Sequence, residues 1–192
     1  MAVAVVEIAL DTVEHDPRLL SDHERSRAQA FRHAVDARRF TALHATLRRL
    51  LAERAGIRPQ DLELLAGPHG KPYVANAPLE FNISRSRERA LVAISVDGDV
   101  VGVDLEYAEP LPDLALLIEQ CGAPPEVRTN VMFYTWWTTV EATVKYHGAT
   151  LADGLEGRSL LPVWTTPLPV AEGWIGALAA ETPLSWSFES VH

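Results

Sequence analysis

Two segments of the chain place acidic and basic side chains at spacings that suit a strand and a helix. Residues 101–106 read Val-Gly-Val-Asp-Leu-Glu, an apolar strand in which Asp104 and Glu106 lie two positions apart and share one face. Residues 137–145 read as a helix in which Glu141 and Lys145, four positions apart, share one face. If the strand meets the helix, three carboxylates and one ammonium converge. Such a group suits a hard divalent cation and a ligand that carries phosphate.

Each segment also has a plainer interpretation when it is taken alone. The two strand carboxylates fit the polar side of an ordinary strand end. The helical pair fits an ion pair worth about 0.3 kcal/mol. The neighbouring Trp136 and Trp137 are more typical of core packing than of ligand contact. The two segments therefore need support from the rest of the chain.

Charge is distributed unevenly along the 192 residues. The net charge of −9 argues against non-specific binding to nucleic acid. More than half of the 17 Lys and Arg residues nevertheless lie between Arg18 and Arg58. This basic stretch indicates either solvated helix surfaces or a pocket for a polyanion, and coenzyme A with its three phosphates would suit the second.

Several classes of site and location are excluded or disfavoured by what the sequence contains. The single Cys121 excludes an intramolecular disulfide and a multi-cysteine metal site. The histidines lack the spacing of a zinc site, and no P-loop or G-x-G-x-x-G motif is present. Met1 to Leu10 lacks a basic signal region, and no apolar run reaches membrane-spanning length. We therefore expect a cytoplasmic protein.

Periodicity and turn residues predict helices and short strands in the first half. Ser21 and Glu24 form a capping box, which predicts the start of a helix, and Gly56 predicts the end of the next one. Asp97-Gly98 predicts a hairpin turn. The predicted elements, in chain order, are a strand over 2–10, helices over 21–33 and 35–55, and strands over 62–65, 81–84, 90–96 and 100–106, with a turn at 67–70.

The second half predicts two helices and a few strands. A short helix covers 114–120, and a long helix runs from Pro125 to His147, with Gly148 just past its end. Strands are expected at Trp164, at 171–180 and at 184–189, the last two forming a hairpin across Thr182-Pro183. Each half then holds helices and a small antiparallel sheet.

Several blocks, in chain order, are similar to the signature of the Sfp-type 4′-phosphopantetheinyl transferases. In that family a Gly-Val-Asp-x-Glu strand precedes a helix with a tryptophan, a Lys-Glu-Ala triplet and a further lysine. Two positions differ from the family pattern: Val140 stands for the first lysine of the helix, and Arg85 stands for a histidine. The blocks are Asp36-Ala37-Arg38-Arg39, Gly70-Lys71-Pro72, Phe81-Asn82-Ile83-Ser84-Arg85-Ser86, and the two segments described above.

The resemblance implies a fold and a division of the chain. The implied fold is α/β (α+β), with two similar, pseudo-symmetric lobes, each a small antiparallel sheet packed with helices. The active site would lie in the cleft between them. We expect residues 1–106 to form an N-terminal lobe on the 3′-phosphate and adenine side of coenzyme A. Residues 107–192 would form a C-terminal lobe with the long helix and the C-terminal strands.

The resemblance also implies a reaction. The family transfers 4′-phosphopantetheine from coenzyme A to a serine of an acyl or peptidyl carrier protein and releases 3′,5′-adenosine bisphosphate. By position, Asp104, Glu106 and Glu141 would hold Mg²⁺. Glu141 would act as the base, and Lys145 would stabilise or protonate the leaving group. We expect a monomer with neither a nucleic-acid nor a membrane partner.

The same comparison assigns binding roles to basic and polar residues of the first half. Arg39, Lys71 and Ser84 match positions that bind the 3′-phosphate and adenine end, with Gly70 and Pro72 completing the turn. Further residues match with other roles: Arg85 with the pyrophosphate, and Arg25 and Arg27 as additional charge. Several cations are needed because three phosphates in one site repel each other and every nearby carboxylate.

The two departures leave alternatives open. Val140 removes a cation beside the expected metal site, and Arg85 is permanently charged and accepts no hydrogen bond. The chain could therefore be an active transferase, or a degenerate relative that binds coenzyme A or a carrier protein without transfer. An unrelated Mg²⁺-dependent phosphoryl enzyme is a third hypothesis. Whether a fatty-acid, polyketide or nonribosomal-peptide carrier is served stays open.

Overall fold

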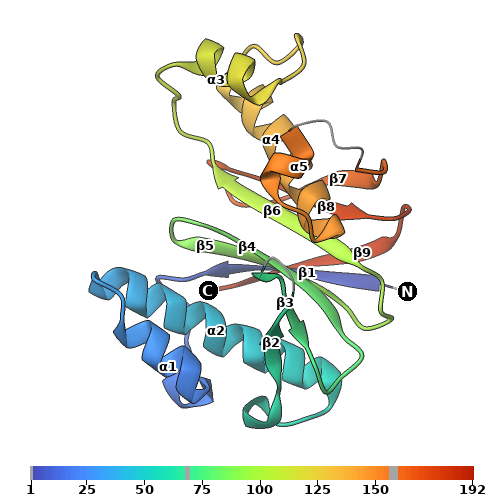
Figure 1. The fold of residues 1–192 in the computed structure, drawn as a ribbon. Coiled ribbons are helices and arrows are strands. Elements are labelled where there is room, and N and C mark those ends of the chain that lie inside the picture. The colour runs from blue at the N-terminus through green and yellow to red at the C-terminus, as the bar shows by residue number, and fades with distance from the viewer. Residues whose placement is uncertain (1, 68–69, 156–159) are drawn as a thin grey trace.

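The helices and strands form four layers, in the order helix, sheet, sheet, helix (Figure 1). This computed structural model describes residues 2–67, 70–155 and 160–192. A four-stranded sheet has the strand order β4-β5-β1-β9, and a three-stranded sheet has the order β6-β8-β7. The bounds of these strands are β1 Ala2–Ala9, β4 Glu80–Ser86, β5 Arg89–Ser95, β6 Val101–Tyr107, β7 Trp164–Leu168, β8 Trp174–Ala180 and β9 Ser185–Val191.

The four-stranded sheet is apolar on both faces. In β1, Val6 and Ile8 pack into the core shared with the long helix α2 (Ala34–Ala55), whereas Val3 and Val5 pack into the core shared with the three-stranded sheet. Because successive residues of a strand point to opposite faces, one β-branched run serves both layers. This explains why residues 2–10 are apolar almost throughout.

The remaining helices and a small hairpin are peripheral. Within the described ranges, no helix is long and apolar enough to cross a membrane. In Figure 1, α3 lies at the opposite end of the molecule from α2. The bounds are α1 Asp22–Gln29, α3 Leu114–Cys121, α4 Asn130–His147, α5 Leu151–Leu155, the 3₁₀ turns η1 Pro17–Leu19 and η2 Pro59–Asp61, and a hairpin of β2 Leu64–Ala66 and β3 Pro72–Val74.

The predicted fold class is confirmed, because small sheets are packed with helices in both halves of the chain. The predicted capping box is confirmed as well: Ser21 Oγ accepts from the Glu24 N–H, and the Glu24 carboxylate accepts from the Ser21 N–H. Gly56 ends α2 with a φ of 67°, the left-handed conformation that glycine adopts without strain. The predicted turn at 67–70 includes residues 68 and 69, which lie outside the described ranges.

Both predicted hairpins, at Asp97-Gly98 and at Thr182-Pro183, are wrong. Asp97-Gly98 does not join paired strands, because β5 belongs to the four-stranded sheet and β6 to the three-stranded one. Thr182-Pro183 likewise separates β8, which pairs with β6 and β7, from β9, which pairs in parallel with β1. The chain crosses between sheets at both turns. The four-stranded sheet is therefore not purely antiparallel.

Two helix limits also differ from the predictions. The long helix α4 begins at Asn130 and is capped by the Thr129 side chain, so Pro125 lies before it. The helix α1 ends at Gln29 and not at residue 33. The division into two lobes at residue 106 stays a prediction. The two sheets do not divide the strands at that residue. β6 pairs with β8 of the second half, and β9 pairs with β1 of the first half.

Candidate active site

The centre of the site is the carboxylate of Asp104, which comes from β6 and is 2% exposed. Its Oδ1 accepts hydrogen bonds from the Ser84 Oγ of β4 at 2.7 Å and from the Lys145 Nζ of α4 at 2.6 Å. Lys145 Nζ also donates to Ser84 Oγ at 3.0 Å. Elements from both sheets and from α4 thus meet at one carboxylate oxygen. Segment 101–106 meets segment 137–145 through the contact of Asp104 with Lys145.

Lys145 reaches Asp104 because α4 lies directly on β6. A Cβ atom built on Gly102 would stand 2.0 Å from the carbonyl oxygen of Ala142 and 2.5 Å from the Tyr146 nitrogen. Only glycine allows this approach, because any side chain would collide with helix backbone. Ala142 itself is fully buried against Ala177 and Ala179 of β8, so small residues on the sheet match the flat helix face.

Glu106 and Glu141 belong to the same electrostatic group. Burial raises the pKa of Glu106 first, followed by the charge of Asp104, and a hydrogen bond from Ser86 Oγ at 3.0 Å opposes the rise. Burial also raises the pKa of Glu141, again with a contribution from Asp104 and an opposing one from Lys145. The three carboxylates thus repel each other across a partly buried site, and Lys145 offsets part of that repulsion.

The predicted metal set is only partly assembled. In the part of the chain that the structure describes, no three His, Cys, Asp or Glu side chains form a group that could hold a metal ion. Asp104 Oδ2 is nevertheless buried and has no hydrogen-bond partner among the described residues. A buried carboxylate oxygen without a donor is a candidate ligand for a cation.

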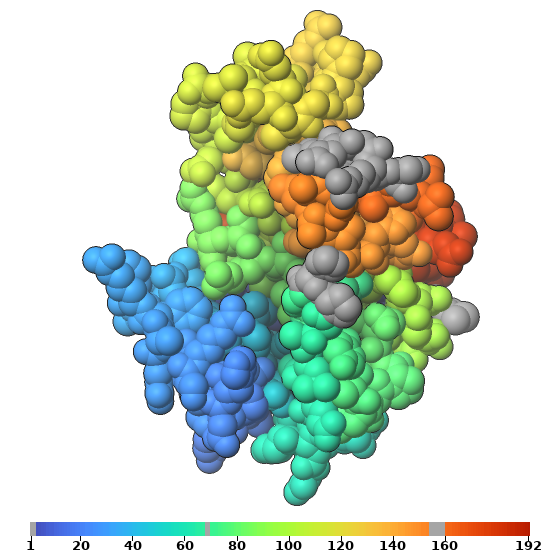
Figure 2. All heavy atoms as spheres, viewed as in Figure 1, coloured from blue at the N-terminus to red at the C-terminus, as the bar shows by residue number. Residues whose placement is uncertain are grey.

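A cavity of about 720 Å³ is lined by residues of α1, α2, the β2–β3 hairpin and β4, and neither Asp104 nor Lys145 is among them. Of the predicted binding residues, Gly70, Pro72, Arg85 and Arg27 line it. Figure 2 shows the surface hollowed between the blue atoms of α1 and the green atoms of the β2–β3 hairpin. The wall combines cationic, imidazole and apolar groups, which suits a ligand with both phosphate and an aromatic base. The other lining residues include His23, Phe31, Phe40, Leu43, His44, Leu65 and Ile83.

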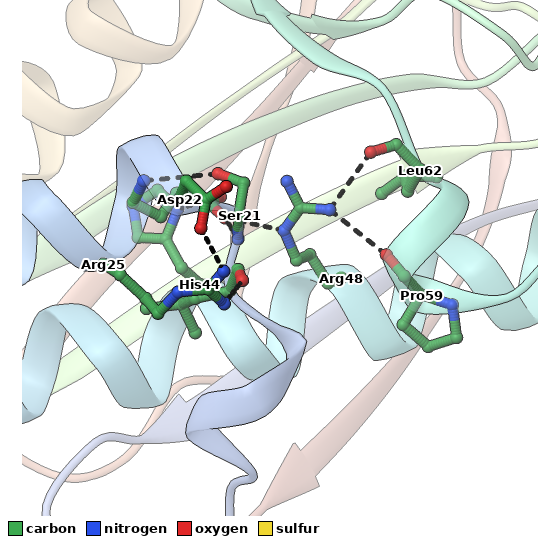
Figure 3. Close-up of polar contacts among 9 residues, drawn as sticks. Ser21, Asp22, Arg25, His44, Arg48, Pro59 and Leu62 are labelled. Atoms are coloured by element: carbon green, nitrogen blue, oxygen red, sulfur yellow. Dashed lines mark hydrogen bonds and ion pairs between the residues drawn. The ribbon is translucent and has the colours of Figure 1, made fainter.

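A buried ionic network holds the walls of this cavity together. Glu24 of α1 accepts hydrogen bonds from the Arg48 Nε of α2 at 2.7 Å and shares its other oxygen with the His44 Nδ1 at 3.1 Å. Arg48 also donates to the carbonyl oxygens of Pro59 and Leu62, which precede β2 (Figure 3). The network therefore links α1, α2 and the segment that leads into the β2–β3 hairpin.

Four of the predicted binding residues do not line this cavity: Arg25, Arg39, Lys71 and Ser84. Ser84 donates to Asp104 instead, and Arg25 pairs with Asp22. Arg39 donates from Nε and Nη2 to the two carboxylate oxygens of Asp11, at 2.8 and 2.7 Å. The hydrogen bond from Arg39 lowers the pKa of Asp11 to about 2. Lys71 lines a separate cavity of about 450 Å³ with Tyr73 and Tyr146, and burial lowers its pKa.

The two tryptophans of the signature helix belong to an aromatic cluster. Trp137 stacks on Phe133 with ring centroids 5.9 Å apart, and Trp136 lies 5.8 Å from the same ring. This arrangement agrees with a packing role for both tryptophans. Val140 lies on the same helix, two residues before Ala142, and is half-buried.

Sequence reasoning missed two residues of β4. Asn82 Oδ1 accepts from the Val103 N–H at 2.8 Å, and Ser86 Oγ accepts from the Tyr107 N–H at 3.1 Å while donating to Glu106. The alternation of Asn82, Ser84 and Ser86 was visible, since polar residues at period two mark one strand face. It did not reveal that this face meets β6.

Comparison with known proteins decides the family. The chain is 31% identical over 169 residues to HetI, a 4′-phosphopantetheinyl transferase of Nostoc sp., and the match covers 81% of this chain and 71% of HetI. The chain belongs to the 4′-phosphopantetheinyl transferase family. No family model matches it.

Two other family members span the same region. The Synechocystis sp. protein slr0495 is 32% identical over 149 residues, covering 71% of this chain and 60% of its own length. The transferase psf-1 of Bacillus pumilus is 28% identical over 152 residues, covering 74% of this chain and 64% of its own length. The chain thus spans less than two thirds of both of these relatives. The resemblance inferred from the signature blocks is confirmed at the level of the family.

Proposed function

We propose that this chain transfers the 4′-phosphopantetheine group of coenzyme A to a serine of an acyl or peptidyl carrier protein and releases 3′,5′-adenosine bisphosphate. The observation that carries the proposal is the contact of Lys145 with Asp104, a carboxylate that shares its site with Glu106 and Glu141. It puts a cation beside a group of carboxylates. Membership of the transferase family supports the same reaction.

Mg²⁺ fits the oxygen donors of this site. Asp104, Glu106 and Glu141 would hold it, and the unpartnered Asp104 Oδ2 is the first candidate ligand. The raised pKa values of both glutamates support the fit, because a cation between them would relieve the repulsion. When bound, the ion would neutralise negative charge on the phosphoryl group in transfer.

Two residues of α4 are suited to the charge and proton changes of the reaction. The serine oxygen bonds to the β-phosphorus, and the bond from that phosphorus to the bridging oxygen of the pyrophosphate breaks, so that this oxygen leaves with 3′,5′-adenosine bisphosphate. The raised pKa of Glu141 increases its affinity for the proton that the serine loses. The Lys145 ammonium, four residues further along the helix, offsets the charge of the departing bisphosphate.

The cavity between α1, α2 and the β2–β3 hairpin is the proposed site for the nucleotide part of coenzyme A. Its volume of about 720 Å³ lies in the range of small-molecule sites. Arg27 and Arg85 supply positive charge at its wall, and Phe31 and Phe40 supply aromatic surface for the base. Arg85 would contact phosphate as a permanent cation, in the position where the family has a titratable histidine.

Intact-mass spectrometry of an apo carrier protein tests the proposal. After incubation with this chain, coenzyme A and Mg²⁺, the carrier should gain the mass of phosphopantetheine, and no gain should follow when a chelator removes the metal. Fatty-acid, polyketide and nonribosomal-peptide carriers should be tried in parallel. No mass gain on any of them, at carrier and enzyme concentrations where a known transferase works, would reject the proposal.

A second candidate function rests on Val140. Loss of the lysine found there in the family favours a relative that binds coenzyme A or a carrier protein without transferring the group. In that case calorimetry would show tight binding of coenzyme A while the carrier mass stays unchanged. Restoring the cation with Val140→Lys should then produce transfer.

A further inference from the structure

Three polar side chains on one face of β4 border the inter-sheet core. Asn82 and Ser84 are buried, and Ser86 is half-buried. Their β5 partners across the ladder include Ala93 and Leu91, which belong to the apolar core between the two sheets. Polar groups at the border of such a core must find partners, because an unpaired buried group costs about 1–3 kcal/mol. All three find them on β6.

Asn82 and Ser86 act on the backbone of β6 at two points four residues apart. Because β6 is an edge strand of the three-stranded sheet, alternate N–H groups point away from its neighbour β8. Asn82 Oδ1 accepts the N–H of Val103 at 2.8 Å, and Ser86 Oγ accepts the N–H of Tyr107 at 3.1 Å. Side chains of β4 thus take the place of a neighbouring strand. They fix the segment that lies between these two points, which carries Asp104 and Glu106.

Ser86 has a second contact that Asn82 lacks. Its hydroxyl donates to Glu106 Oε2 at 3.0 Å while it accepts from the backbone of the next residue. One hydroxyl therefore fixes both the strand and the orientation of a carboxylate on it. Ser84, between the two, donates to Asp104.

We propose that Asn82 and Ser86 are positioning residues of the site, with different effects. Ser86 orients the Glu106 carboxylate toward the cation, and Asn82 fixes the strand that presents both carboxylates. This inference rests on the proposed function, in which Asp104 and Glu106 take part in binding Mg²⁺ and coenzyme A. It predicts that Ser86 controls the Mg²⁺ dependence of ligand binding, whereas Asn82 controls the stability of the β4–β6 contact.

Calorimetric titration of coenzyme A over a series of Mg²⁺ concentrations tests the role of Ser86. Loss of a hydrogen-bond partner of a metal ligand typically lowers metal affinity by about 10–100-fold. Ser86→Ala should therefore raise the Mg²⁺ concentration needed for half of the enhancement of coenzyme A binding by about tenfold. Ser86→Thr keeps the hydroxyl and should restore the wild-type value.

Ser95→Ala is the matched control. Ser95 lies on the neighbouring strand β5, is buried, and its Oγ accepts a backbone N–H from Asp99 at 3.1 Å, but it does not contact a carboxylate of the site. It should leave the Mg²⁺ midpoint unchanged. An unchanged midpoint in Ser86→Ala, or an equal shift in Ser95→Ala, would overturn the role of Ser86 while the proposed function stands. Binding by the wild-type chain that ignores Mg²⁺ would instead reject the metal role in the proposed function, and this inference with it.

Hydrogen exchange tests the role of Asn82 without any ligand. In Asn82→Ala the amide of Val103 should exchange at least tenfold faster than in the wild type, while amides of β1 and β9 keep their rates. In the wild type the amides of Val103 and Tyr107 should both be protected. If either amide exchanges freely in the wild type, the hydrogen bonds that define these positioning residues do not form in solution.

Discussion

The two carboxylate oxygens of Asp104 have different surroundings. Oδ1 accepts from Ser84 and from Lys145, whereas Oδ2 is buried and has no hydrogen-bond partner among residues 2–67, 70–155 and 160–192. One oxygen is therefore held in place by the protein, and the other is available to a cation. In the proposed function, Oδ2 is therefore the oxygen that would bind Mg²⁺.

Glu106 predicts a pH-dependent stability. Because its pKa is raised from the ordinary 4.5, the folded chain holds its proton more tightly than the unfolded chain. This contribution to stability is complete below the ordinary pKa and is lost as pH rises through the raised one. Glu106→Gln should thus raise the melting temperature at pH 8 without metal, with a smaller gain toward pH 4.5. The exposed Glu53→Gln on α2 should show no such trend. A Glu106→Gln variant that melts below the wild type at pH 8 would contradict the repulsion described here.

The positions of Arg85 and Arg39 predict unequal effects on binding. Arg85 lines the cavity, whereas both carboxylate oxygens of Asp11 already engage Arg39. A hydrogen bond to a charged group is worth about 1.5–3 kcal/mol, so Arg85→Ala should weaken coenzyme A by about tenfold or more. Arg39→Ala should weaken it less than threefold. Calorimetry with coenzyme A and dephospho-coenzyme A checks both. A loss for Arg39→Ala that appears only with coenzyme A would restore its predicted 3′-phosphate role.

The sequence placed Asp104 and Glu106 on one strand face, and Glu141 and Lys145 on one helix face, but it did not establish that the two faces meet or what holds them. The spacing of Asp104 and Glu106, and of Glu141 and Lys145, is a local property that period-two and helical geometry determine. The contacts of Asn82 and Ser86 with β6 depend on which strand lies opposite β4, and no local pattern contains that information.

The approach of α4 to β6 depends on one missing side chain. Gly102→Ala would place a Cβ about as close to the Ala142 carbonyl as a covalent neighbour, so the helix must move away. Overpacking of this kind costs about 1–3 kcal/mol or more, and here it also withdraws Lys145 from Asp104. We expect a lower melting temperature together with at least a 100-fold loss of transfer. Thermal unfolding and a transfer assay measure the two, and wild-type values of both would show that the contact is looser than described.

The Glu24–Arg48 pair predicts how α1 is held. Burial alone would raise the pKa of Glu24, but hydrogen bonds from His44, the Ser21 N–H and Arg48 outweigh it and lower the pKa from 4.5 to about 2. Because this pKa is lowered, the stabilising contribution is complete above 4.5 and is lost as pH falls through 2. Glu24→Gln leaves a buried arginine without its counter-charge and should cost about 3–5 kcal/mol at pH 7. The exposed pair of Asp16 and Arg18 offers a control, since solvent screens it and Asp16→Asn should change stability far less. Chemical denaturation measures both, and equal costs would exclude a special role for Glu24.

The limits of helices were predicted better than the pairing of strands. Helices α2 and α3 begin and end close to the predicted limits, because caps and periodicity are encoded within each segment. The turns at Asp97-Gly98 and Thr182-Pro183 were also recognised as breaks between strands. Their interpretation as hairpins was wrong, because a turn residue permits a change of direction but does not select the strand that pairs next.

Over the whole molecule, the last strand of the chain pairs with the first. The strand β9 lies parallel to β1 along the full length from Ala2–Ser185 to Ile8–Val191, after the chain has built the three-stranded sheet in between. The two sheets share a core, and β9 from the second half of the chain completes the four-stranded sheet. This arrangement holds the two sheets together more firmly than a linker between two separate lobes would. The meeting of Ser84 from one sheet with Asp104 from the other depends on that arrangement.

Intact-mass spectrometry of a carrier protein, with the wild-type chain and Asp104→Asn side by side, tests the central claim most directly. The substitution keeps the shape of the side chain but removes the charge that faces Lys145. With coenzyme A and Mg²⁺, the wild type should add one phosphopantetheine group for each 3′,5′-adenosine bisphosphate released, and Asp104→Asn should be at least 100-fold slower. Transfer by Asp104→Asn at the wild-type rate would contradict the assigned site, and no transfer by the wild type to any carrier class would contradict the proposed function.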